Sequence, residues 1–162
     1  MDRLRRASVG ALVHDLDARS PAGCAIGLHI RFTMPSYMFQ SYPRRWIDHY
    51  ATAGLFAHDP TVRWGMANVG WVRWEELERI DGSGVLQQAR NHGIMNGVTI
   101  ALVAERSRTI ASFARSDRDY EAEEIAALER IVADLHRATA NPELLTSSDR
   151  QALRRLSDRL TH

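Results

Sequence analysis

The spacing of apolar residues predicts a long amphipathic helix near each end of the chain. Apolar side chains recur at helical spacing from residue 2 to residue 18, before Ser20 and Pro21. The same spacing returns from about residue 120 to residue 139, where glutamates come first and His136 and Arg137 come last. This order of charges favours a helix because it complements the macrodipole.

Between these helices, alternating apolar and β-branched residues predict four strands. The strands are expected at residues 24–32, 71–74, 97–104 and 109–115. A polar turn at residues 105–108 separates the last two strands, which predicts a β-hairpin.

Start and stop signals predict three shorter helices. They are expected at residues 43–53, from Asp59 to about residue 68, and at residues 84–92. Pro43 and Pro60 suit a first helical turn, and Asp59 is a good N-cap. Together with the hairpin, these helices predict an α/β fold of the α+β type. It would be an α-β-α sandwich whose mainly antiparallel central sheet lies between helical layers.

The last part of the chain has the signals of a linker and one more helix. Residues 141–145 contain a proline and are expected to be the linker. Thr146 and Asp149 have capping-box spacing, and leucines follow at positions 153, 156 and 160. The arginines at positions 150, 154, 155 and 159 favour a solvent-exposed face over DNA contact, because one helix alone cannot dock a DNA reader.

The composition is that of an ordinary globular domain. Of the 162 residues, 44% are hydrophobic and 25% are charged, which is enough apolar material for a core. The formal net charge of +1 gives the whole chain no electrostatic footprint for nucleic acid. One cysteine allows no intrachain disulfide, and no apolar run suits a membrane span. We expect a soluble cytoplasmic protein with no membrane partner.

Catalytic and metal-binding chemistry has little support in the sequence. The histidines lack the spacing of converging metal ligands. Cys24 lies on a predicted buried strand, and no neighbouring base is available to activate it as a nucleophile. We therefore expect no metal site, no catalytic residues, no cofactor and no enzymatic activity.

An aromatic stripe is the strongest local signal. Trp46 and Tyr50 lie one turn apart on the same face of a predicted helix, and Tyr42 lies near its start. One interpretation is core packing, which large aromatic side chains dominate. The other is a ligand pocket, because Trp and Tyr each bring a hydrogen-bond donor into an apolar space. The stripe alone leaves both interpretations open.

Residues further along the chain extend this pattern. Asp59 follows Tyr50 by nine positions and precedes a proline, and Trp74 follows Asp59 by fifteen. A segment with glycines at 93 and 97 then leads into a strand, and Ser112 is a polar position in the next strand. In this order and at this spacing, the chain resembles the autoinducer-binding domain of LuxR-type quorum-sensing regulators.

The resemblance covers residues 1–140 and implies a PAS/GAF-like sandwich that encloses an N-acyl homoserine lactone. It implies that Trp46 donates to the lactone carbonyl and that the Asp59 carboxylate accepts from the amide N–H. The hydroxyls of Tyr50 and Ser112 would hold the acyl carbonyl, and Thr61 would add a hydroxyl near the amide.

The remaining implied contacts are apolar. Trp74 would pack on the lactone ring, and the acyl tail would be lined by Tyr42, Val62 and Met66. With these, every polar atom of the ligand has a partner, as a buried site requires.

The resemblance also implies partners. Family members are dimers, and the predicted helices at residues 2–18 and 120–139 are candidate surfaces for a homodimer. Full-length members continue into a helix-turn-helix DNA-binding domain, and residues 146–162 resemble its start. We expect DNA binding only through that domain, which is missing from this sequence.

Three functional classes follow from these patterns. The first is the signal-sensing part of a transcriptional regulator. The second is a natural sensor-only protein that forms heterodimers with full-length relatives and inhibits them. The third is an enzyme acting on the lactone, for which the sequence contains no catalytic constellation.

Overall fold

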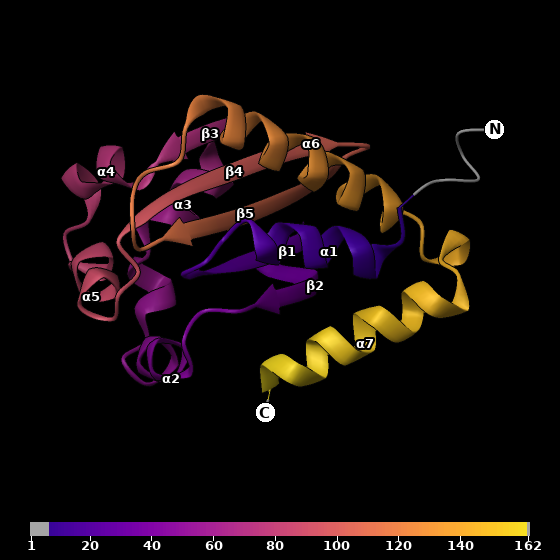
Figure 1. The fold of residues 1–162 in the computed structure, drawn as a ribbon, viewed down its shortest axis with the longest axis horizontal. Coiled ribbons are helices and arrows are strands. Elements are labelled where there is room, and N and C mark those ends of the chain that lie inside the picture. Colours follow the sequence, from indigo (N-terminus) through magenta and orange to yellow (C-terminus); the bar gives the residue numbers. More distant parts are fainter. Residues whose placement is uncertain (1–6, 162) are drawn as a thin grey trace.

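The computed structural model describes residues 7–161, with side chains described through residue 154. Five strands form one sheet with helices on both faces (Figure 1). The strand order is β2-β1-β5-β4-β3, and every neighbouring pair is antiparallel. The expected α-β-α sandwich with an antiparallel sheet is confirmed.

The elements have the following bounds. The strands are β1 (Gly23–Arg31), β2 (Met34–Gln40), β3 (Gly70–Arg73), β4 (Asn96–Ala104) and β5 (Ser107–Arg115). The α-helices are α1 (Val9–Ala18), α2 (Arg44–Thr52), α3 (Pro60–Ala67), α4 (Trp74–Leu77), α5 (Val85–Asn91), α6 (Ala122–Ala138) and α7 (Ser147–Thr161). Short 3-10 helices are η2 (Leu55–His58), η3 (Glu78–Ile80) and η4 (Pro142–Leu144).

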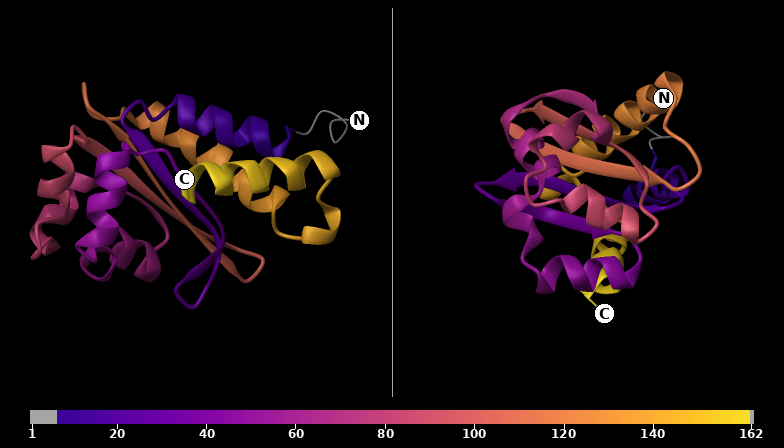
Figure 2. Two further views of the ribbon diagram at one scale, coloured as in Figure 1. Left: turned by 90° about the horizontal axis from the view of Figure 1, so that it is seen from below. Right: turned by 90° about the vertical axis from the view of Figure 1, so that its left-hand side faces the viewer.

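The helices divide between the two faces of the sheet. Figure 2 shows α1, α6 and α7 on one side and α2 and α5 on the other. The side under α1 and α6 holds the main core, to which alternate strand residues such as Ile26, Leu28 and Phe113 contribute fully buried side chains. Val9 and Leu128 fill this core from the two helices. The apolar faces that made these helices candidate dimer surfaces are therefore buried within the domain.

Helix α7 packs against α1 and β2. Its capping box is present, because Asp149 accepts from the Thr146 N–H at 3.4 Å and donates its own N–H to the Thr146 hydroxyl at 3.0 Å. Asp149 also accepts from the N–H of Val9 at 3.1 Å, and Leu153 is buried in the main core. Arg150 and Arg154 are exposed. The side chains predicted at positions 155, 156, 159 and 160 lie outside the described residues.

The first helix is shorter than its apolar spacing predicted. It begins at Val9 because the hydroxyl of Ser8 accepts from the N–H of Ala11 at 3.1 Å and caps the helix. Residues 2–6 of the predicted helix lie outside the described residues. No helix among residues 7–161 is long and apolar enough to cross a membrane.

Strand β2 was not predicted. Its run contains Pro35, which cannot donate to a sheet ladder and argues against a central strand. The strand order explains how the proline is tolerated, because β2 lies at the edge of the sheet and pairs only with β1. The absence of this strand from the sequence prediction matters, because β2 forms one wall of the site described below.

Two further boundaries differ from the prediction. The strand expected at residues 71–74 ends at Arg73, and Trp74 begins the four-residue helix α4. The hairpin turn contains only Glu105 and Arg106, both at positive φ, and Ser107 already belongs to β5. Neither turn residue is glycine or asparagine, the usual signal for such a tight turn, so the sequence suggested a longer one.

Candidate ligand-binding site

A cavity of about 260 Å³ lies on the face of the sheet opposite the main core. Its floor on β1 is made of Ala25 and Gly27, the small residues that alternate with Ile26 and Leu28. A Cβ added to Gly27 would meet Pro35 at 3.5 Å, an ordinary contact, and Gly27 does not have a positive φ. The backbone therefore does not require glycine here, and its missing side chain enlarges the cavity.

All nine residues singled out from the sequence line this cavity. They are Tyr42, Trp46, Tyr50, Asp59, Thr61, Val62, Met66, Trp74 and Ser112. They come from α2 and the segment before it, α3 and its N-cap, α4 and β5, so segments up to 70 residues apart in the chain converge on one space.

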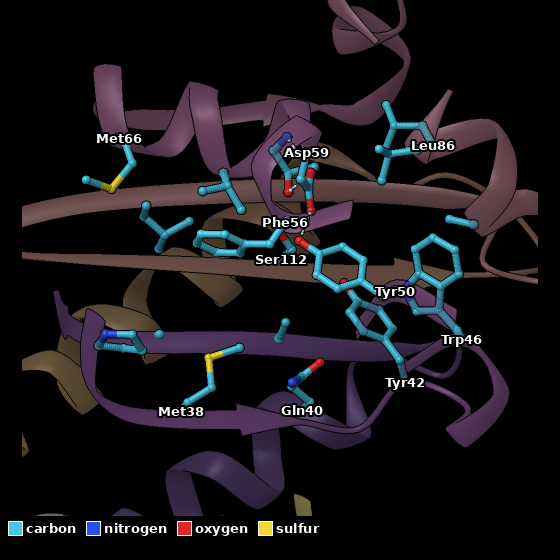
Figure 3. Close-up of a pocket in the computed structure, with 18 of the residues that line it drawn as sticks. Met38, Gln40, Tyr42, Trp46, Tyr50, Phe56, Asp59, Met66, Leu86 and Ser112 are labelled. Atoms are coloured by element: carbon cyan, nitrogen blue, oxygen red, sulfur yellow. Dashed lines mark hydrogen bonds between the residues drawn. The ribbon is translucent and has the colours of Figure 1, made fainter. Parts of the chain in front are cut away.

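One end of the cavity is aromatic. Trp46 and Tyr50 lie on the same face of α2 with ring centroids 5.7 Å apart in an edge-on arrangement. Figure 3 shows Tyr42 beside them rather than beside Met66, so the three aromatic residues lie together. Burial raises the pKa of Tyr42 well above its usual value, so its hydroxyl keeps its proton.

The indole N–H of Trp46 is free to bind a ligand. It has no hydrogen-bond partner among residues 7–161, although the Trp46 side chain is buried. No side-chain nitrogen or oxygen in the described part of the chain is both fully buried and unpaired. The Trp46 N–H therefore opens onto the cavity that this residue lines.

Asp59 has two structural tasks at once. Its Oδ1 accepts from the backbone N–H and the hydroxyl of Thr61, at 2.8 Å and 2.7 Å, which caps α3. Its Oδ2 accepts from the Tyr50 hydroxyl at 2.7 Å. Burial raises the pKa of Asp59, while the hydrogen bonds from Thr61 and Tyr50 act in the opposite direction and stabilise the carboxylate. The cap and the cavity thus share one carboxylate.

Trp74 is held by a short relay of hydrogen bonds. Its indole N–H donates to the Thr99 hydroxyl at 3.0 Å, and Thr99 and Ser112 hydroxyls lie 2.7 Å apart. Since Thr99 accepts from Trp74, it can donate to Ser112, which leaves the Ser112 proton free to point into the cavity. Gly97 allows this packing, because a Cβ there would lie 2.2 Å from the Trp74 ring. Gly97 therefore makes room for an indole at the start of β4, the strand that the sequence predicted from residue 97.

The other end of the cavity is apolar. Figure 3 shows Met38 and Met66 on its two sides, away from Trp46 and Tyr50, with Phe56 between the ends. Phe56 is 51% exposed and Met66 is 38% exposed, so this part of the cavity lies near the surface. The site therefore combines a polar, aromatic end with an apolar end.

Twelve lining residues were missed by the sequence analysis. They are Ala25, Gly27, Ile30, Thr33, Pro35, Met38, Gln40, Phe56, Val85, Leu86, Ala89 and Ile110. The small residues of β1 gave a usable signal, because a strand that alternates Ile and Leu with Ala and Gly has one full face and one empty face. The residues of β2 gave none, since that strand was not recognised.

The histidines form two pairs that their sequence spacing did not indicate. His49 and His92 stack with ring centroids 5.5 Å apart next to Trp46. His29 and His136 are buried on the opposite face of the sheet, with ring centroids 4.2 Å apart. No group of three or more potential metal ligands occurs among the residues that the structure describes.

The buried pair is a closed network. The Nε2–H of His29 donates to the His136 carbonyl at 2.9 Å, and its Nδ1 accepts from the Ser107 hydroxyl at 2.7 Å. His136 donates through Nε2 to the Ala104 carbonyl at 3.0 Å and accepts at Nδ1 from Thr109 at 2.7 Å. Burial lowers the pKa of His29, which fits this neutral tautomer. We interpret the network as structural.

Cys24 is buried on β1, as the sequence predicted. Burial raises the pKa of its thiol. Reactive cysteines have a lowered pKa and solvent access, and Cys24 has neither.

Comparison with known proteins places this architecture in a family. The autoinducer binding domain family model matches residues 31–139. The transcriptional activator VanR of Vibrio anguillarum is 30% identical over 88 residues, which cover 52% of this chain and 37% of VanR. The activator SolR of Ralstonia nicotianae is 30% identical over 112 residues, covering 67% of this chain and 48% of SolR. The chain thus spans about half, or less, of the length of these curated relatives.

Solved structures show the same fold. SdiA of Escherichia coli superposes with a TM-score of 0.62 at 21% identity, over 98% of this chain and 66% of that chain. CepR2 of Burkholderia cenocepacia superposes with a TM-score of 0.61 at 19% identity, over 85% and 86% of the two chains. With the family match over most of its length, the chain belongs to the autoinducer-binding domains of LuxR-type transcriptional regulators.

Proposed function

We propose that the chain binds an N-acyl homoserine lactone in the cavity and is the sensor part of a quorum-sensing regulator. One observation carries this proposal: the unpaired Trp46 N–H and the Asp59 carboxylate lie at the same end of a cavity whose other end is apolar. The ligand has the same division, with a polar lactone and amide at one end and an alkyl tail at the other. CepR2, which shares the fold, is described as dependent on N-acylhomoserine lactone.

The Asp59 carboxylate would accept the amide N–H of the ligand. Its Oδ1 already accepts twice from Thr61, so the remaining capacity is at Oδ2, which Tyr50 shares. A hydrogen bond to a charged acceptor contributes about 1.5–3 kcal/mol, more than a neutral one. The Thr61 hydroxyl fixes the carboxylate from the side of the helix and keeps it near the amide.

The lactone ring would lie between the two buried tryptophans. Trp46 would donate its free N–H to the lactone carbonyl. Trp74 would pack against the ring, because its own N–H is committed to Thr99 and only its apolar surface remains for the ligand.

The acyl carbonyl would lie between the hydroxyls of Ser112 and Tyr50. The relay from Trp74 through Thr99 leaves the Ser112 proton available for this contact. The Tyr50 hydroxyl would turn its hydrogen bond from Asp59 to the acyl carbonyl. The amide N–H of the ligand would then take the place of Tyr50 at the carboxylate. The tail would continue along Val62, Met66 and Met38 toward the apolar end.

The rest of the regulator extends this proposal. We expect the domain to self-associate, and we expect DNA to be bound by a C-terminal domain that residues 141–145 link to the sensor. The segment 146–162 would then be the start of that domain.

Calorimetric titration with two ligands that share a tail tests the proposal. N-octanoyl homoserine lactone should bind, whereas octanoyl-rac-glycerol, the ligand in one SdiA structure, lacks the lactone and the amide N–H and should bind at least about tenfold more weakly. Lactone at a thousandfold excess over Kd should also stabilise the fold by about 4 kcal/mol and raise its melting temperature and soluble yield. Equal affinity for the two ligands would show that Asp59 and Trp46 do not bind the head group.

A further inference from the structure

Four polar side-chain groups lining the cavity have no hydrogen-bond partner among residues 7–161. They are the Trp46 N–H, the Tyr42 hydroxyl, the side-chain amide of Gln40 and the hydroxyl of Thr33, which is exposed to solvent. The other polar groups of the wall are already paired, Asp59 with Tyr50 and Ser112 with Thr99. The proposed function gives Trp46 a partner but gives none to Gln40.

Gln40 lies at the boundary between the two ends of the cavity. In the sheet, Gln40 pairs with Ala25 and Ala25 pairs with Ser112, so the three form one row across the cavity floor. The next row toward the apolar end is Met38, Gly27 and Ile110. Figure 3 shows the Gln40 amide directed into the cavity between Tyr42 and Met38.

The row gives the spacing between Gln40 and Ser112. They are two strands apart, about 10 Å between backbones, and the small Ala25 lies between them. The long Gln40 side chain and the short Ser112 side chain, with only an alanine between them, leave room for one chain of ligand atoms. A tail whose carbonyl is bonded to Ser112 passes the Gln40 amide with its first carbons.

An unsubstituted alkyl tail would cover this amide without offering it a hydrogen bond. The amide would lose its water and gain no partner, which costs binding free energy. A carbonyl or hydroxyl oxygen at the same place would replace the water, because an amide both donates and accepts. The wall therefore fits a tail that carries an oxygen close to the acyl carbonyl.

We propose that Gln40 is a specificity-determining residue that hydrogen-bonds an oxygen substituent on the third carbon of the acyl chain. This inference rests on the proposed function and names the class of lactone: 3-oxo or 3-hydroxy acyl homoserine lactones rather than unsubstituted ones. The amide can donate to a 3-oxo group and can also accept from a 3-hydroxyl group.

The test compares three lactones of equal chain length on the whole chain. N-octanoyl, N-(3-oxooctanoyl) and N-(3-hydroxyoctanoyl) homoserine lactones are titrated into the wild type and into Gln40→Met, which keeps the length of the side chain and removes the amide. We expect the wild type to bind at least one of the substituted lactones about tenfold more tightly than the octanoyl lactone. Gln40→Met should abolish or reverse this preference by binding the octanoyl lactone as well or better.

A neighbouring variant controls for changes in shape. Met38→Leu alters an apolar residue of the same strand that lines the tail, so it should shift the affinities for all three lactones together and keep the preference for the substituted lactone. Equal binding of all three lactones by the wild type overturns the proposal, and so does a preference that survives in Gln40→Met. If no lactone binds the wild type, the proposed function itself is wrong; if all bind equally, only the role of Gln40 is wrong.

Discussion

The two faces of one sheet differ in what they do with the same backbone. Strand β1 presents Ile26 and Leu28 to α1 and α6, where they are fully buried in the main core. The residues that alternate with them, Ala25 and Gly27, face the cavity and leave it open. A period of two puts these residues on opposite faces, so the size of alternate residues alone makes one face a core and the other a site.

The polar groups of the two faces differ in the same way. On the core face, the ring nitrogens of His29 and His136 are hydrogen-bonded, and the hydroxyls of Ser107 and Thr109 are among their partners. On the cavity face, Trp46 and Gln40 offer hydrogen bonds that nothing in the described chain accepts. A fully hydrogen-bonded network stabilises one conformation, whereas unpaired polar groups in a cavity are available to bind a ligand.

The largest effect is expected from truncating a buried side chain on the core face of the sheet. Phe113→Ala should lower the free energy of unfolding by about 3–5 kcal/mol, because Phe113 is completely buried and its loss leaves a void. The next residue, Ser112, faces the cavity, and Ser112→Ala should cost less than about 1.5 kcal/mol. Urea unfolding measures both. Equal losses would mean that the two faces do not differ as described.

The second effect concerns ligand binding at the open face. Asp59→Ala should weaken lactone binding about a hundredfold or more, since it removes a charged acceptor and the helix cap together. Asp59→Asn has one acceptor oxygen, which can cap α3 or accept the ligand amide but not do both, so this variant should bind more weakly than wild type and more tightly than Asp59→Ala. Calorimetry separates the three. Unchanged affinity in Asp59→Ala would reduce the residue to a cap.

A smaller effect is expected from filling the cavity floor. Gly27→Val should fold normally, since a Cβ fits there, and should weaken binding of octanoyl lactone about tenfold by occupying the space of its tail. Its control is Ala111→Val, which places the same side chain on the opposite face by adding two methyl groups. That change should destabilise the fold by about 1–3 kcal/mol and leave affinity unchanged. If Ala111→Val weakened binding and Gly27→Val only destabilised the fold, the ligand would bind on the opposite face of the sheet from the one described.

The smallest effect is a pH dependence from the closed network. Because burial lowers the pKa of His29, the folded state binds fewer protons than the unfolded state below about pH 6.5. The contribution of His29 to the free energy of unfolding should therefore be constant above pH 6.5 and fall toward pH 5.5. The raised pKa of Asp59 acts in the opposite sense, so a variant is needed to isolate the histidine.

His29→Asn provides that variant, because asparagine tolerates the positive φ of 53° at this position. Urea unfolding at pH 7.5 and pH 5.5 should give a smaller loss in this variant than in the wild type. An equal loss in both proteins would assign the pH dependence to other groups.

The sequence predicted the parts of the site that depend on local signals. Trp46 and Tyr50 were placed on one face by helical spacing, and Asp59 was identified as an N-cap by its position before Pro60. Gln40 and Met38 were missed because Pro35 argued against a strand at the position of the edge strand β2. The inferences for Trp46, Tyr50 and Asp59 succeeded because each needed only a few neighbouring residues.

Long-range pairings had no such signal. His29 and His136 lie 107 residues apart, and their contact depends on how α6 crosses the sheet. Thr99 was missed for the same reason, since its role is visible only once Trp74 packs over Gly97. The family resemblance supplied the site residues that local physics could not bring together.

The most direct test of the open face is the set of four indole N–H resonances in nitrogen-15-labelled protein titrated with N-octanoyl homoserine lactone. Trp46→Phe assigns its resonance, and Trp71, paired with Ile100 on the opposite face, serves as the internal reference. We predict that the Trp46 resonance moves most, as its free N–H gains the lactone carbonyl, while that of Trp71 stays in place. A saturating titration that leaves Trp46 unmoved would contradict the account.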